Sequence, residues 1–131
     1  MKLTFLCTKW RDKVTATTRL VYFEYNLPVG IDMAQRYLVE CFFVGALQMR
    51  CSIVTDIESG DCIIIDGGSE AEKLIQHIKG QGSHIPDNSN GLVIEKPRKV
   101  VALVNTHAHF DHSGEIPILK EYFGVEWWLH E

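Results

Sequence analysis

From residue 37 onward, the chain alternates short apolar runs with short polar segments, as expected for strands and helices joined by turns. Apolar, β-branched or aromatic runs predict strands at 37–45, 50–56, 62–66, 99–105 and 125–129. The polar segment "IESGD" joins the second run to the third and predicts a hairpin over residues 50–66. The third run is apolar at every position until Asp66, as expected for a strand covered on both faces.

The first helix is predicted over residues 70–79, directly after the third strand. Ser69 and Glu72 match the S-x-x-E capping box, in which two side chains satisfy free N–H groups at the helix start. Gly80 is expected to end the helix, because glycine readily adopts the left-handed conformation found at helix C-termini.

A second helix is predicted over residues 114–124. Pro117 falls in its first turn, where proline is tolerated, and Gly124 is expected to end it. Between the helices, residues 81–98 are rich in Gly, Pro, Asn and Ser and predict a long loop with a short strand at 92–94. Strands and helices alternating at this spacing predict an α/β fold, in which helices pack on a sheet with buried inner strands.

The first 36 residues fit this alternation less well. The segment 17–27 is a candidate for an additional strand, but no motif occurs before Met33, and the chain shows no internal repeat or low-complexity tract. We therefore predict an N-terminal extension of unknown role over residues 1–36, followed over 37–131 by the part that carries the α/β alternation.

Composition narrows the class of protein. The chain has 131 residues, 46% hydrophobic and 23% charged, which is typical of a soluble single domain. A net charge of −4 without a block of Lys and Arg predicts neither nucleic acid nor a membrane surface as partner. No apolar run approaches the roughly 18 residues of a transmembrane helix. Charged residues also interrupt the N-terminal apolar stretch before a secretory signal could form, which predicts a cytoplasmic protein.

The pattern of the cysteines also favours a cytoplasmic location. None belongs to a C-x-x-C pair, and each lies in or beside an apolar stretch: Cys7, Cys41, Cys51 and Cys62. Free cysteine is among the most buried residue types, so we predict reduced, buried thiols.

Metal-ligand chemistry is concentrated in "NTHAHFDH" at 105–112, at the end of a predicted strand. Residues two apart on an extended backbone point to the same side, so His107 and His109 can present their imidazoles to one metal. Asp111 and His112 follow where the chain turns toward the next helix, and can converge on a neighbouring second metal. Imidazole nitrogens with carboxylate oxygens suit zinc, and also iron or manganese.

Three stretches resemble a known family. The stretch "THAHFDH" at 106–112 is similar to the T-H-x-H-x-D-H signature of the metallo-β-lactamase superfamily, and "CIIIDGG" at 62–68 resembles the strand and Asp-Gly that precede it there. At 44–54, "VGALQMRCSIV" resembles the opening of the glyoxalase II-like branch, which contains hydroxyacylglutathione hydrolases. The resemblance implies that residues 37–131 form the first half of an αββα sandwich: a mixed sheet with helices on its outer face.

The resemblance also implies a site. His107 and His109 would bind one metal, Asp111 and His112 a second, and Asp66 would support the motif loop from behind. From the residues alone, Asp66 could instead cap a turn at the strand end. The implied cofactor is zinc, as one or two ions, with iron or manganese as alternatives.

The implied reaction is hydrolysis of an ester or thioester bond in a small-molecule substrate. In such a reaction a metal-activated hydroxide attacks the carbonyl carbon while a metal polarises the carbonyl oxygen, and Asp111 orients the hydroxide. No G-x-S-x-G, P-loop or nucleotide fingerprint suggests another chemistry. Two alternatives remain: an iron-dependent oxidoreductase like the persulfide dioxygenases, which share this motif, and a truncated, non-catalytic metal-binding module.

The family draws its remaining metal ligands from segments beyond residue 131. His130 is the first candidate for a substitute ligand, ahead of His77 and His84. We therefore expect the 131-residue chain alone to hydrolyse thioesters negligibly. We also expect it to self-associate, or to need a partner chain that supplies the missing C-terminal half.

Overall fold

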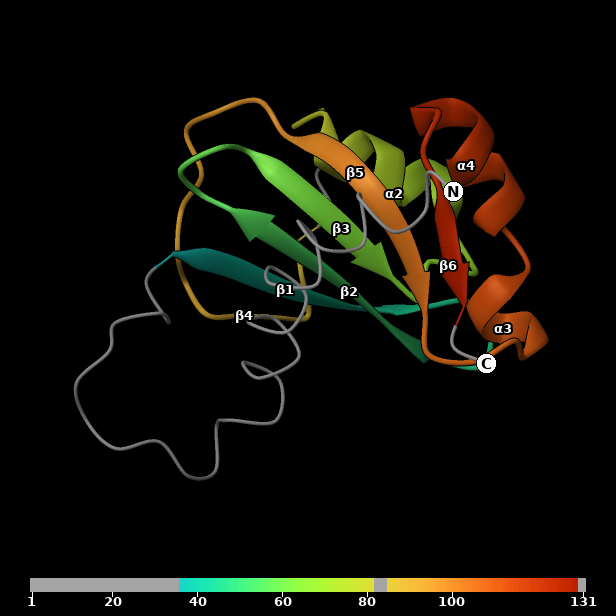
Figure 1. Cartoon of the computed structure of the whole chain (residues 1–131). Coiled ribbons are helices and arrows are strands. Elements are labelled where there is room, and N and C mark those ends of the chain that lie inside the picture. Colours follow the sequence, from blue (N-terminus) through green and yellow to red (C-terminus); the bar gives the residue numbers. More distant parts are fainter. Residues whose placement is uncertain (1–35, 82–84, 130–131) are drawn as a thin grey trace, which may run out of the picture. The chain divides into compact units, whose positions relative to one another are not determined.

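The computed structural model describes residues 36–81 and 85–129 of the chain. The strands form one six-stranded mixed sheet in the order β4-β1-β2-β3-β5-β6 (Figure 1). They are β1 (Tyr37–Val44), β2 (Met49–Asp56), β3 (Asp61–Ile65), β4 (Asn88–Ser89), β5 (Lys99–Asn105) and β6 (Trp127–Leu129). The helices are α2 (Ala71–Ile78), α3 (Phe110–Ser113) and α4 (Ile116–Phe123).

The pairing of the strands sets where the loops emerge. β1, β2 and β3 are antiparallel neighbours, so the hairpin predicted over residues 50–66 is confirmed. β3 runs parallel to β5, and β5 runs parallel to β6, with helices in the connections. Because parallel strands share a direction, the loops that follow β3 and β5 leave the sheet at the same edge.

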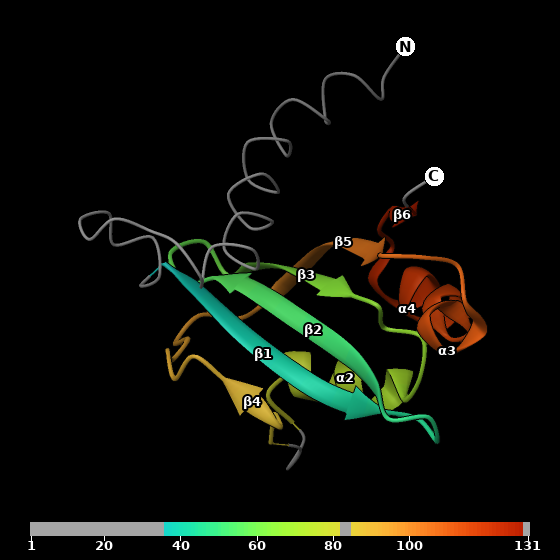
Figure 2. The ribbon, with the colours of Figure 1, turned by 90° about the horizontal axis from the view of Figure 1, so that it is seen from below.

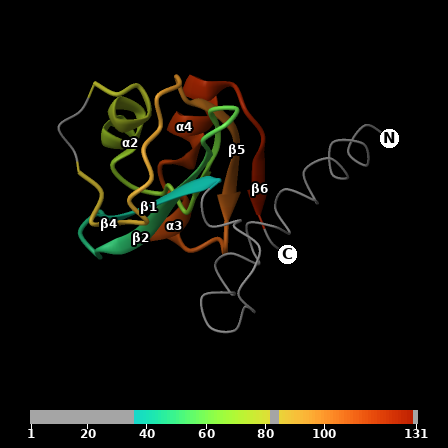
Figure 3. The same cartoon turned by 90° about the vertical axis from the view of Figure 1, so that its left-hand side faces the viewer.

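The helices pack on one face of the sheet, as Figure 2 shows, and α2 and α4 lie side by side on that face (Figure 3). The core between the layers contains apolar side chains of both, among them Phe42, Ile53, Ile64, Leu74, Ile78, Leu103, Ile116 and Leu119. A mixed sheet with helices on one face is the fold class predicted for the first half of the sandwich. The candidate strand at 17–27 lies outside the described residues.

The second predicted helix is present as α4, and a short extra helix, α3, precedes it. Pro117 lies in the first turn of α4, and Gly124 ends it with a φ of 64°, donating its N–H to the carbonyl of Lys120 at 2.9 Å. Over the described ranges, the structure contains no helix that is long and apolar enough to cross a membrane.

The capping box predicted for α2 is wrong. The N-cap residue is Glu70, with φ 56° and ψ 40°, and its side chain makes no capping hydrogen bond. The N–H of Ala71 instead donates to Oε2 of Glu115 at 2.6 Å. A carboxylate from the segment before α4 therefore has the role that the sequence pattern assigned to Ser69 and Glu72, and its negative charge suits the helix N-terminus.

The strand predicted at 92–94 is also wrong. The loop instead contributes β4, which pairs with the outer edge of β1. Polar side chains of the loop bind the same edge: Asp87 Oδ2 accepts the N–H of Phe43, and Asn90 Nδ2 donates to the carbonyl of Tyr37, both at 2.7 Å. Hydrogen bonds from polar side chains can hold a loop against a strand edge without any apolar pattern. The apolar run at 92–94 therefore did not indicate which part of the loop joins the sheet.

The described cysteines, Cys41, Cys51 and Cys62, are free and buried as predicted, whereas Cys7 lies outside the described residues. Burial raises the pKa of the Cys51 thiol above its ordinary range, and raises the pKa of Cys62 to about 12. Both thiols therefore stay protonated near neutral pH and behave as small apolar side chains.

A buried carboxylate joins β1, α2 and the segment before β5. Glu40 is 4% exposed. Its Oε1 lies 2.9 Å from His77 Nε2, and Arg98 Nη1 donates to its Oε2 at 2.7 Å. Burial by itself would raise the pKa of Glu40, but the hydrogen bonds with His77 and Arg98 outweigh it and hold the pKa below the ordinary value of 4.5.

Glu40→Gln is expected to lower the free energy of unfolding at pH 7 by about 3 kcal/mol, because Arg98 is left without its buried partner. The folded-state pKa of Glu40 lies below the unfolded one, so its stabilisation is present above about pH 4.5 and is lost as the pH falls through the folded-state pKa. In urea unfolding at decreasing pH, the free energies of unfolding of the wild type and of Glu40→Gln should therefore converge.

Glu58→Gln is the control, because the Glu58 side chain is 70% exposed and its substitution should have little effect on stability. A stability difference between wild type and Glu40→Gln that stays constant from pH 7 to the acid range would contradict the assignment of the lowered pKa to Glu40.

Candidate metal centre

The carboxyl end of β5 delivers the histidine motif to the edge of the sheet. The sequence suggested that His107 and His109 lie on extended strand backbone, but β5 ends at Asn105. The two histidines therefore lie in the loop beyond the strand. The chain bends at Thr106 and His107, and the two imidazoles meet edge to face with their centroids 4.5 Å apart. A bend after the strand, and not strand alternation, therefore brings the two rings together.

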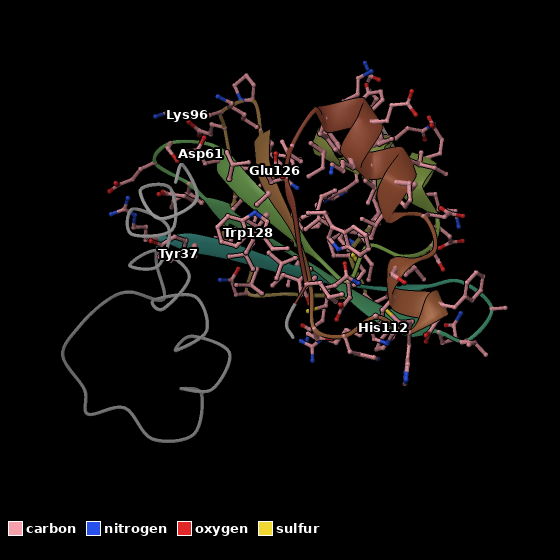
Figure 4. All side chains as sticks on the ribbon, turned by 45° about the vertical axis from the view of Figure 1, so that its right-hand side comes forward. Tyr37, Asp61, Lys96, His112, Glu126 and Trp128 are labelled. Atoms are coloured by element: carbon pink, nitrogen blue, oxygen red, sulfur yellow. The ribbon has the colours of Figure 1, made fainter. Side chains whose placement is uncertain are left out.

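The short helix α3 brings the second pair to the same place. The ring centroid of His112 lies 4.0 Å from that of His107. Asp111 Oδ2 lies 3.6 Å from His112 Nε2. Figure 4 shows His112 on α3, near the edge of the sheet where β5 ends. The structure thus brings the four motif residues His107, His109, Asp111 and His112 into one cluster.

Asp66 holds the start of the motif loop. It directly follows β3, is 5% exposed and has a φ of 55°, a conformation that Asp tolerates better than most residues. Its carboxylate accepts two hydrogen bonds from Thr106, from the backbone N–H at 2.8 Å and from the hydroxyl at 2.7 Å. This is the contact expected of a residue that supports the loop from behind, and its effect on metal binding stays a prediction.

Thr106 also determines the tautomer of His107. Its hydroxyl has a single proton, which it donates to Asp66. The Nδ1 of His107 lies 2.9 Å from the same hydroxyl oxygen, so Nδ1 must be the donor of that second hydrogen bond. The Nε2 of His107 is then left with a free lone pair, which is the form of imidazole that binds a metal.

The loop between β3 and α2 packs directly against α3. A Cβ atom on Gly68 would lie 2.1 Å from the carbonyl carbon of His112 and 2.4 Å from the carbonyl oxygen of Asp111. The N–H of Glu115 donates to the carbonyl of Gly68 at 2.9 Å. Two backbones can approach this closely only at a glycine, so Gly68 positions the helix that carries Asp111 and His112.

The chemistry of the cluster fits a metal ion. Imidazoles with a carboxylate are ligands of zinc, iron and manganese. His112 Nδ1 is buried 3.2 Å from Asp66 Oδ2, yet nothing in the described part of the chain gives it a well-formed hydrogen bond. Across residues 36–81 and 85–129, however, no three His, Cys, Asp or Glu side chains are arranged to hold an ion by themselves. The cluster therefore supplies suitable donors but not a complete ligand set.

Of the three weaker candidates for additional ligands, the structure describes His77 alone. His77 lies on α2, where it contacts Glu40 and the ring of Phe42 in the core. His84 and His130 lie outside the described residues.

Asp66→Asn is expected to preserve the fold and to weaken zinc binding about 10- to 100-fold, the usual effect of losing a partner behind a metal ligand. Thr106→Val should act similarly, because it keeps the side-chain shape but removes the hydroxyl that fixes the tautomer of His107. Isothermal titration with zinc measures both.

Thr106→Ser is the matched control, because serine retains the hydroxyl and should bind zinc like the wild type. A loss of binding in Asp66→Asn as complete as that caused by removing His107 would mean that Asp66 is itself a ligand.

The fold and the cluster together define a class: α/β proteins in which a cluster of His and Asp side chains follows a parallel strand at the edge of the sheet. Residues 44–131 match the family model described as the metallo-beta-lactamase superfamily. The chain belongs to this superfamily, which confirms the membership that its motifs predicted.

Curated relatives add detail. An uncharacterized protein of Aquifex aeolicus is 36% identical over 71% of this chain and 36% of its own length. The hydroxyacylglutathione hydrolase GloC of Haemophilus influenzae is 38% identical over 69% of this chain and 35% of its own length. The probable metallo-hydrolase YqgX of Bacillus subtilis is 31% identical over 67% of this chain and 34% of its own length. The chain thus spans about a third of the length of these relatives.

A solved structure shows the same fold. The BLEG-1 B3 metallo-beta-lactamase superposes with a TM-score of 0.56 at 24% identity, over 70% of this chain and 36% of that one. At this level of identity the likeness concerns the fold alone.

Proposed function

We propose that this protein is a metal-dependent hydrolase of ester or thioester bonds, of the glyoxalase II-like kind. The observation that carries the proposal is the clustering of His107, His109, Asp111 and His112 at one edge of the sheet in a member of this superfamily. The two relatives whose names state an activity are both hydrolases, and one is a hydroxyacylglutathione hydrolase.

Each side chain has a defined part in this proposal. His107 and His109 would hold one ion and Asp111 and His112 a second, with zinc as the proposed metal and iron or manganese as alternatives. Such an ion lowers the pKa of water toward neutrality and polarises a carbonyl group. The carboxylate of Asp111 would also orient the attacking water by accepting its hydrogen bond. Asp66 acts one step away, since it holds the loop that carries these ligands.

The remaining ligands must come from elsewhere, because a catalytic zinc usually has three protein ligands and the cluster does not supply them alone. We propose that a second copy or a partner chain completes the site, so that the 131-residue chain alone turns over thioesters negligibly. The free, buried thiols support a reducing, cytoplasmic location.

The test is metal-dependent release of thiol from acylglutathiones. The purified chain, alone and together with a chain that supplies the remaining ligands, is stripped of metal, reloaded with zinc, iron or manganese, and assayed in parallel for oxygen uptake with a persulfide substrate. Thiol release that requires metal and disappears in His107→Ala supports the hydrolase. Oxygen uptake that occurs only in the iron-loaded protein would favour the oxidoreductase over the hydrolase. Metal binding without either activity, even when the completing chain is present, would favour the non-catalytic module.

A further inference from the structure

A buried amide connects β6 to the end of α3. Asn105, the last residue of β5, is 1% exposed. Its Nδ2 donates to the backbone carbonyl of His112 at 2.6 Å, and its Oδ1 accepts the indole N–H of Trp127 at 3.0 Å. One side chain therefore joins the neighbouring strand to the backbone of a predicted metal ligand.

The chemistry of the two partners fixes the orientation of this amide. The indole N–H of Trp127 can only donate, and the carbonyl of His112 can only accept. If the amide of Asn105 were reversed, two donors would face each other at one end and two acceptors at the other, and both hydrogen bonds would be lost. Trp127 therefore determines that Asn105 presents its donor to His112.

The register of the sheet places the indole for this contact. Trp127 pairs with Leu103, two residues before Asn105, so Trp127 and Asn105 point to the same face of the sheet. Trp128 is the next residue on β6 and points to the opposite face, as its labelled side chain shows in Figure 4.

The bonded carbonyl lies near the end of a helix of only four residues, α3. Carbonyls in the last turn of a helix have no partner within the helix. A hydrogen bond from outside the helix therefore does much to hold them in position. Asp66 holds Thr106 at the start of the motif, and Asn105 holds His112 at its end. Both ends of the ligand-bearing segment are thus tied to the sheet.

We propose that Asn105, oriented by Trp127, is a positioning residue for the metal ion held by Asp111 and His112. This inference rests on the proposed function and names a further residue of the same site. Asn105 touches neither metal nor substrate, because it acts through the backbone of His112. Its loss should weaken binding at Asp111 and His112 more than at His107, which Asp66 and Thr106 hold separately.

Indole N–H signals in proton–nitrogen NMR spectra of the whole 131-residue chain report this bridge directly. Trp127→Phe removes one signal and assigns it, and Trp128→Phe assigns its neighbour. Zinc should shift the Trp127 signal and leave that of Trp128 almost unchanged. In Asn105→Leu, which has a similar size but no amide, the response of Trp127 to zinc should disappear.

Zinc titration gives the energetic test. Asn105→Asp, which still accepts from Trp127 but cannot donate to His112, should lower zinc affinity at least about 10-fold. Trp127→Phe should lower it about 5-fold, which corresponds to one neutral hydrogen bond. The double variant should bind no worse than Asn105→Asp, because Trp127 acts only through the hydrogen bond from Asn105 to His112, which Asn105→Asp already removes. Trp128→Phe, the matched control, should bind like the wild type.

Wild-type zinc affinity in a folded Asn105→Asp protein, checked by circular dichroism, would overturn the inference. If that variant does not fold, equal affinities of Trp127→Phe and Trp128→Phe would overturn it instead. Absence of thioester hydrolysis even with the completing chain present, together with the expected affinity losses, would sink the proposed function and leave the positioning role of Asn105 standing.

Discussion

Replacing His107 and His109 together with alanine is expected to abolish stoichiometric binding of zinc, iron or manganese near neutral pH. The hydrogen bond at Nδ1 of His107 leaves its Nε2 available to a metal, and both imidazoles are proposed ligands of the same ion. The remaining pair, Asp111 and His112, offers fewer donors than the three protein ligands of a typical catalytic zinc. The metal content per chain, measured by elemental analysis after dialysis in buffered metal, should therefore fall from stoichiometric to near zero.

The matched control is His77→Gln. His77 lies in the core beside Glu40, and glutamine can keep a hydrogen bond to that carboxylate, so the metal content should stay at the wild-type level. Metal content that remains unchanged in the His107 and His109 double variant would show that the motif is not the metal centre.

The strands and helices that the sequence predicted well are those whose signal is local. The central residues of β3, Cys62 to Ile64, are apolar because consecutive side chains are buried there, and Gly124 marks the end of α4 because it adopts positive φ. The capping of α2 failed for the opposite reason. Its partner, Glu115, is 44 residues away, and no local pattern can reveal a tertiary cap.

The candidate site divides in the same way. The four motif residues and Asp66 could be named from spacing and resemblance, and the structure brings them close together. The role of Asn105 could not be predicted, because it depends on β6 lying beside β5 and bringing Trp127 within hydrogen-bonding distance. The bend at His107 was missed because the extended pattern continues in the sequence beyond the point where β5 ends.

Gly68→Ala is expected to lower the free energy of unfolding by about 3 kcal/mol and to disrupt metal binding at the same time. Gly68 does not adopt a left-handed φ, so the cost is steric and not conformational. The new methyl group would lie 2.1 Å from the carbonyl carbon of His112 and 2.5 Å from its carbonyl oxygen. Because those atoms are backbone, α3 must move as a unit and take Asp111 and His112 with it.

Gly67→Ala separates this effect from a general intolerance of the loop. Its methyl group would meet Leu119 Cδ1 at 2.8 Å and Ile64 Cγ2 at 2.9 Å, which are side-chain methyl groups of the core and not backbone atoms of α3. We expect urea unfolding to show a smaller loss of stability for Gly67→Ala, and zinc titration to show nearly wild-type affinity. If Gly68→Ala were as stable as the wild type and bound zinc equally well, the close packing of Gly68 against α3 would not be what positions these two ligands.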